Sequence, residues 1–154
     1  MTTMAQSTDP IHLNREAGAQ APPRRSALSI VLWVVQVLLA LLFIWAGGFK
    51  LVATPEQLAG PPGSVALPIA FLLFIGVCEL LGGLGLILPS LLRIKPGLTP
   101  LAAAGLVIIM IGAVGITFAG GGGVGMALVP AVTGLLAGFV SYGRWRLAPI
   151  RPRQ

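Results

Sequence analysis

One carboxylate stands in the middle of a stretch that is otherwise apolar. Glu79 lies within FLLFIGVCELLGGLGLILP, residues 71–89. The stretch is long enough to cross a bilayer. A chargeable side chain at that depth costs about 2.5–3.5 kcal/mol even on the mildest scales, so it is kept where it has a partner, a cavity or a task. Glu79 is therefore the first candidate for chemistry in this chain.

Two uncharged polar side chains are expected at the depth of Glu79. At 1.5 Å per residue, Glu79, Gln36 and Thr133 each lie roughly 12–13 Å from the end of their apolar run that is predicted to be cytoplasmic. We predict that Gln36, Thr133 or both form a hydrogen bond with Glu79, because an unsatisfied polar group in hydrocarbon is costly. Alternatively, the two side chains only join helices to one another.

Lys50 is the other candidate site residue. It projects from the same side of the first apolar run as Gln36, within about 40° on a 3.6-residue helix. By residue count it stands about 15 Å from Glu79 along the axis, so a direct ion pair requires a tilted or re-entrant segment. A water-filled passage between the two charges is equally compatible, and an interfacial anchor with its charge in water is the simpler role.

The remaining reactive residue types give no further site. Cys78 precedes Glu79, but its side chain points about 100° away on a helix. A lone cysteine of this kind is usually an unreactive packing residue. His12 has no partner ligands nearby, so no metal site is expected. The glycines at 120–123 and 125 lack the ending of a phosphate-binding loop. The sequence thus predicts no catalytic residue, no metal and no cofactor.

Composition identifies the class of protein in which Glu79 must be positioned. Of the 154 residues, 56% are hydrophobic and 9% charged, whereas soluble domains have about 25% charged residues. The net charge of +6 comes from basic residues at the ends of apolar runs, without the interleaved aromatic residues of a nucleic-acid surface. Composition therefore indicates a membrane protein that contacts the lipid bilayer and no nucleic acid.

Four apolar runs predict an all-α integral membrane four-helix bundle over residues 27–142. The expected spans are 28–47, 66–88, 99–119 and 124–142. Residues 1–26 are expected to form a disordered tail and 143–154 a basic tail. All basic residues except Lys50 then fall on one side of the membrane, so the positive-inside rule predicts that both termini are cytoplasmic.

Small residues are expected where these spans touch. Gly76, Gly82 and Gly83 lie within about 60° of Glu79 on a helix, so this side of the span should meet another helix rather than lipid. Gly105 and Gly112 are the corresponding candidates for helix packing in the third span.

Three segments together resemble one family of small membrane proteins. WAGGFKL at residues 45–51, CELLGGLGLILP at 78–89 and LTPLAAAGLVIIMIGA at 98–113 are similar to the DoxX-like family, and the likeness runs over residues 26–141. By position, Lys50 and Glu79 match the family's recurrent lysine and glutamate, and Gly82 and Gly83 match its small residues. The resemblance implies a four-helix bundle in a bacterial inner membrane.

The resemblance also implies a class of function. Some relatives are subunits of membrane oxidoreductases that pass electrons from sulfur compounds to quinone, and others belong to oxidative-stress complexes. Many have no known activity. Quinone is a cofactor by resemblance only, since no residue here can be assigned to it.

Three functions stay open at this point. The first is an accessory, non-catalytic subunit whose membrane or peripheral redox partner docks at the basic cytoplasmic face. The second is a small proton-coupled transporter or solute-binding membrane protein that uses Glu79 and Lys50. The third is a purely structural bundle. The residues do not identify an enzyme and do not indicate an oligomeric state.

Overall fold

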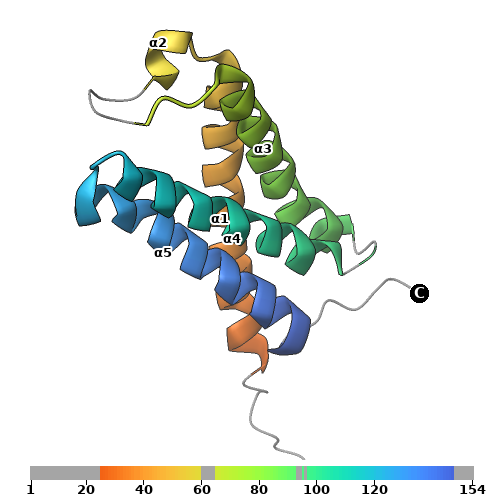
Figure 1. The fold of residues 1–154 in the computed structure, drawn as a ribbon. Helices are drawn as coiled ribbons and strands as arrows, with labels where there is room; N and C mark the ends of the chain where they lie inside the picture. Colours follow the sequence, from red (N-terminus) through yellow and green to blue (C-terminus); the bar gives the residue numbers. More distant parts are fainter. Residues whose placement is uncertain (1–24, 60–64, 93–94, 96, 148–154) are drawn as a thin grey trace, which may run out of the picture.

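The computed structural model describes residues 25–59, 65–92, 95 and 97–147, and all regular structure in this part of the chain is helical (Figure 1). Four helices are long: α1 Arg25–Val52, α3 Ile69–Leu92, α4 Leu98–Ala119 and α5 Gly123–Tyr142. Two elements are short: α2 Pro55–Leu58 and the π-helical turn η1 Gly143–Leu147. The predicted all-α fold class is confirmed.

Each long helix is apolar and long enough to cross a membrane. A helix suits this setting because it bonds its own backbone N–H and C=O groups, for which lipid offers no partners. Large apolar side chains point outward, with Ile108 71% and Leu135 75% exposed. The chain is therefore a multi-pass membrane protein whose apolar outer surface is suited to contact with lipid.

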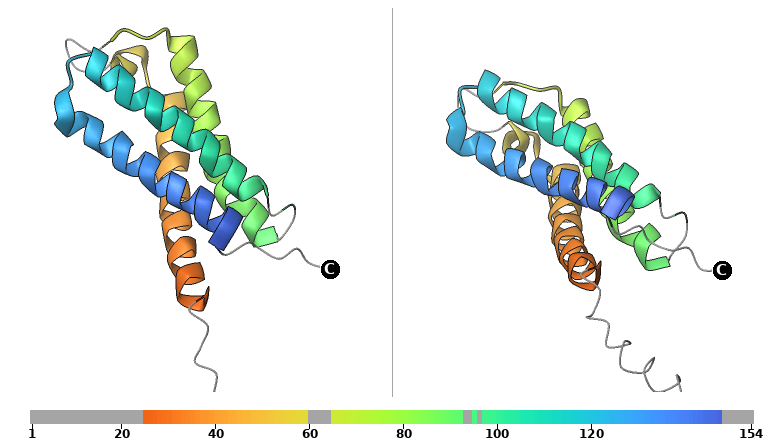
Figure 2. Two further views of the ribbon diagram at one scale, coloured as in Figure 1. Left: turned by 60° about the horizontal axis from the view of Figure 1, so that its bottom comes forward. Right: turned by 90° about the horizontal axis from the view of Figure 1, so that it is seen from below.

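The four helices form two antiparallel pairs. Helix α1 packs along α3, and α4 packs along α5, while the contact between α3 and α4 joins the pairs. Figures 1 and 2 show α4 and α5 side by side, crossing α1 obliquely, so that α1 and α5 touch over a short length only. The shared core is apolar and draws on all four helices: Leu39, Ala40, Phe43, Leu86, Ala103, Leu106, Met110, Ala137 and Val140.

We call one end of the bundle the basic end. It is the end where α1 and α4 begin and α3 and α5 finish, and it carries Lys95, Arg144 and Arg146. Helix α2 and the turn between α4 and α5 lie at the opposite end (Figure 1). That the basic end faces the cytoplasm stays a prediction.

The helices differ from the expected spans at functionally relevant places. Helix α1 continues past Gly47 to Val52, so Lys50 is helical, and α3 begins at Ile69 and continues through Pro89 to Leu92. The expected basic tail instead starts with η1, in which Arg144 is buried. Residues 1–24 of the expected N-terminal tail lie outside the described part of the chain.

Candidate functional site

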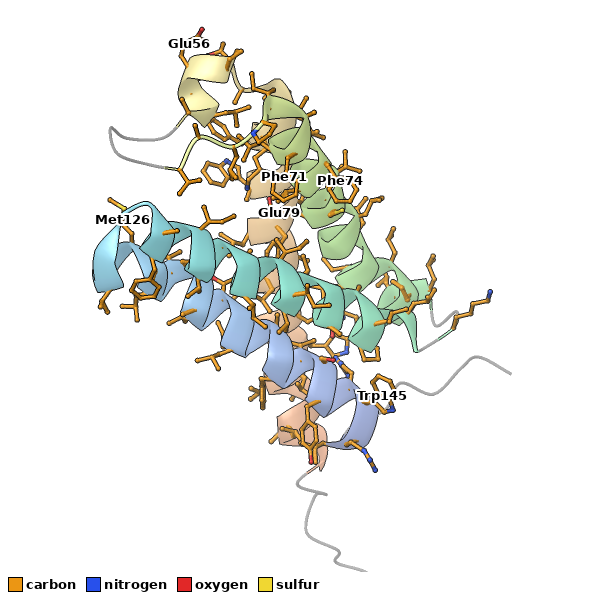
Figure 3. All side chains as sticks on the ribbon, viewed as in Figure 1. Glu56, Phe71, Phe74, Glu79, Met126 and Trp145 are labelled. Carbon is orange, nitrogen blue, oxygen red and sulfur yellow. The ribbon has the colours of Figure 1, made fainter. Side chains whose placement is uncertain are left out.

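An ion pair joins α1 to α3 inside the bundle. Lys50 Nζ donates a hydrogen bond to Glu79 Oε2 across 2.6 Å. The Glu79 side chain is 5% exposed and that of Lys50 is 26% exposed. Figure 3 shows Glu79 on the inner side of α3, where that helix passes α1. The structure therefore answers the question of whether Lys50 reaches Glu79: the two charges are in direct contact.

Two glycines make this contact geometrically feasible. A Cβ on Gly47 would lie 2.6 Å from the carbonyl oxygen of Gly76 and 2.7 Å from the backbone nitrogen of Leu80. A Cβ on Gly76 would lie 2.9 Å from that of Lys50. Because residues three apart share a helix face, the close approach at Gly47 and Gly76 brings Lys50 on one helix against Glu79 on the antiparallel other.

The predicted hydrogen bonds to Glu79 from Gln36 and Thr133 are wrong. Gln36 bonds elsewhere, and Thr133 Oγ1 donates to the backbone oxygen of Val129 on its own helix, 2.8 Å away. The reason is the register between α1 and α3. Glu79 lies beside Gly47, which is about 16 Å further along α1 than Gln36 at 1.5 Å per residue. Counting from the helix ends assumes that the two ends are level, but Gln36, 11 residues after Arg25, lies beside Ser90, two residues before the end of α3, so the helices are offset along their axes.

Gln36 instead belongs to a second polar cluster, near the basic end. Its Nε2 donates to Ser90 Oγ at 2.9 Å and to the carbonyl oxygen of Leu86, and its Oε1 accepts from Arg144 Nε at 2.9 Å. Ser90 Oγ also bonds Thr99 Oγ1 at 2.8 Å. This cluster connects α1, α3, α4 and η1, so it fixes how the two helix pairs meet.

Arg144 is the most unusual member of this cluster. It is 4% exposed, and its guanidinium carbon lies 5.2 Å from the centroid of the Trp33 ring, a cation–π arrangement. The sequence predicts Arg144 in a basic tail, because it follows the last apolar run. The only local feature of the sequence that could indicate its burial is the neighbouring run of aromatic and basic residues, and such a run is equally typical of a membrane interface.

The hydrogen bonds of the two threonines predict different costs of replacement. Thr99→Val should lower the free energy of unfolding by about 1 kcal/mol or more, because Ser90 loses a buried partner. Thr133→Val is the matched control and should cost a few tenths at most, since its hydroxyl bonds only its own helix. Unfolding in detergent micelles measures both, and a larger cost at Thr133 would contradict the assigned network.

The glycines expected at helix contacts divide into two groups. Gly76 and Gly83 lie against α1, and Gly82 lies against Leu106 of α4. A Cβ added at Gly105 or Gly112 would meet no atom within 4 Å, so the expectation of helix packing there is not met within this chain. Both face outward because the opposite side of α4 already meets α3 and α5.

The other candidates stay apart from the ion pair. Among the described residues, no group of three or more His, Cys, Asp and Glu side chains could hold a metal ion. Cys78 is a half-buried free thiol.

The Lys50–Glu79 pair is the best candidate site in the described structure. Chemically, such a pair can release or take up a proton, and either charged group can exchange its partner for a mobile ion.

Comparison with known proteins places the chain in a family. Searches of curated proteins and of solved structures found no match to the chain. The family model described as the DoxX-like family matches residues 34–140, a range that contains Gln36, Lys50, Glu79 and Thr133. Since this match covers more than half of the chain and the fold has four membrane-spanning helices, the protein belongs to the DoxX-like family.

Proposed function

We propose that this protein is a non-catalytic subunit of a membrane redox system, quinone-linked or concerned with oxidative stress, and that the Lys50–Glu79 pair is its functional centre. The observation that carries the proposal is the buried ion pair itself. Apolar residues of similar volume often stabilise a protein as well as a buried ion pair does. A pair held in the membrane by two glycines therefore suggests a task beyond packing.

A protonic role fits the chemistry of such a system. Reduction of a quinone consumes protons together with electrons, so a carboxylate paired with an ammonium inside the membrane suits a subunit that handles protons or charge beside an electron-carrying partner. The basic end supports a docking site for an acidic partner, since Lys95 and Arg146 are exposed there. We propose a bacterial inner membrane as the location, with this end in the cytoplasm.

The proposal is tested by recovering the protein with its partners. Wild type, Glu79→Gln and the control Glu56→Gln, which changes an exposed acid on α2, are expressed at matched levels from the native locus and isolated in mild detergent. We expect a redox partner with all three. Quinone-linked activity should fall at least about tenfold in Glu79→Gln alone, because a positioned proton-transfer group contributes about 10²-fold or more.

Two outcomes contradict this function. Either no redox protein accompanies the wild type, or the activity of the Glu79→Gln complex equals that of the Glu56→Gln complex. The first outcome removes the redox-subunit function, and the second leaves the pair without a task in it.

One observation favours a second candidate, a proton-coupled carrier. Lys50 is 26% exposed while Glu79 is almost fully buried, so the pair is accessible through its lysine. Purified protein in liposomes loaded with a pH-sensitive dye should then collapse an imposed proton gradient, and Glu79→Gln should not. Vesicles that hold the gradient equally with wild type and variant exclude proton movement by the protein alone.

A further inference from the structure

A long groove follows the outer side of α4 and α5, away from the ion pair. It consists of two hollows of about 740 and 660 Å³ that share Val107 and Gly138 as lining residues. The first hollow, toward the opposite end, is lined by apolar and glycine residues, among them Val114 and Pro130. The second continues toward the basic end. Because they share these two residues, the hollows form one open groove between the two helices.

The end of the groove differs chemically from its length. Its lining there includes Ser141, Tyr142, Trp145 and Arg146. Ser141 Oγ donates to the carbonyl oxygen of Pro100 at 3.0 Å, so this hydroxyl is already engaged. Tyr142 and Trp145 are 61% and 65% exposed, as expected for aromatic residues at the headgroup level of a membrane. The groove thus joins an apolar length to a cationic, aromatic mouth.

The dimensions fit one leaflet of a bilayer. From Tyr142 to Pro130 the groove follows α5 for about 18 Å at 1.5 Å per residue, and one leaflet of the hydrocarbon core is about 15 Å thick. An acyl chain laid along the groove from the basic end would therefore finish near Pro130 and Val114. Its headgroup would lie beside the guanidinium of Arg146.

We infer that this groove binds an anionic phospholipid, with one acyl chain along α4 and α5 and the headgroup phosphate at Arg146. Charge complementarity selects this occupant. A guanidinium binds phosphate oxygens through paired hydrogen bonds, and basic pockets between membrane helices recognise anionic headgroups. The groove lies on a different face from the Lys50–Glu79 pair. Arg146 also belongs to the basic end at which a partner is proposed to dock, so lipid binding is measured on the isolated chain, where the result does not depend on the proposed function.

Binding is measured with the full chain in detergent by native mass spectrometry. The probes are phosphatidylglycerol and phosphatidylcholine with identical acyl chains. We expect wild type to prefer phosphatidylglycerol. Arg146→Gln should reduce that preference about fivefold, the effect of one basic residue near a charged headgroup. Lys95→Gln, which removes an exposed charge at the same end but outside the groove, should leave the preference unchanged.

A second pair of variants tests the groove without changing charge. Gly138 lines both hollows, and a Cβ there would meet only Val107 at 3.9 Å, so the first atom of a new side chain has room and Gly138→Leu is expected to place its bulk in the groove. It should weaken binding of both lipids. Gly105→Leu adds the same bulk to an open surface of α4 and should not.

Three results overturn the inference. The first is equal binding of the two lipids by wild type, which would indicate unselective lipid contact or a neutral occupant. The second is equal loss in Arg146→Gln and Lys95→Gln, which would indicate a general effect of basic charge. The third is equal binding by Gly138→Leu and Gly105→Leu, which would place the lipid elsewhere.

Discussion

Lys50→Met is expected to lower the free energy of unfolding by about 3–5 kcal/mol, because it leaves the carboxylate of Glu79 buried without its counter-charge. Reversible unfolding in mixed detergent micelles measures this loss. Lys95→Met is the matched control: it removes an exposed lysine at the basic end and should change stability by no more than about 0.5 kcal/mol. Equal effects of the two substitutions would contradict a buried pair and return Lys50 to the role of an interfacial anchor.

The double substitution Lys50→Met/Glu79→Met should recover most of the stability that either single change loses. Replacing a whole buried ion pair by apolar residues of similar volume is often neutral or stabilising, whereas breaking it is not. This variant also separates function from folding. If it is stable but its isolated complex lacks quinone-linked activity, the pair has a functional task. If it is stable and fully active, the pair only joins two helices.

Gly47→Ala should destabilise the protein by about 1–3 kcal/mol, the usual cost of forcing extra bulk into a packed contact. The new methyl group would lie 2.6 Å from the oxygen of Gly76 and 2.7 Å from the nitrogen of Leu80, both backbone atoms that no side-chain rotation can move. Helices α1 and α3 must therefore separate, which also pulls Lys50 away from Glu79. Thermal unfolding in detergent checks the prediction.

Gly48→Ala is the control for this change, because nothing lies within 4 Å of a Cβ at that position. In a helix interior, alanine is favoured over glycine by about 0.5–1 kcal/mol, so this variant should match or exceed wild-type stability. The neighbouring glycines should thus respond in opposite directions. A similar loss at both positions would show that the α1–α3 contact is not as close as the structure has it.

Local properties of the sequence are sufficient to predict the class of fold. Four apolar runs indicate four membrane helices, because each must satisfy its own backbone in lipid regardless of its neighbours. The cost of Glu79 in an apolar run is likewise local, and so the sequence alone identifies it as a candidate. Lys50 is identified too, but from the sequence its contact with Glu79 is one of several arrangements.

Register and crossing geometry decide the rest. Counting inward from the span ends groups Gln36, Glu79 and Thr133, because it assumes that neighbouring helices end at the same level. In the structure α1 is offset along α3, so Gln36 lies beside Ser90 and Gly47 lies beside Glu79. Neither the continuation of α1 through Gly47 and Gly48 nor that of α3 through Pro89 follows from propensity, which disfavours glycine and proline in helices.

By itself the sequence determines that this protein is an all-α membrane bundle and that the Glu79 carboxylate lies in an apolar segment, where its burial costs free energy. Both follow from hydropathy along single chain segments. Only the tertiary structure decides that Lys50 is its partner and that Arg144 is buried against Trp33 and Gln36. These contacts depend on how closely two backbones approach. That distance is set jointly by residues far apart in sequence, such as Gly47 and Gly76, so it cannot be predicted from any one segment.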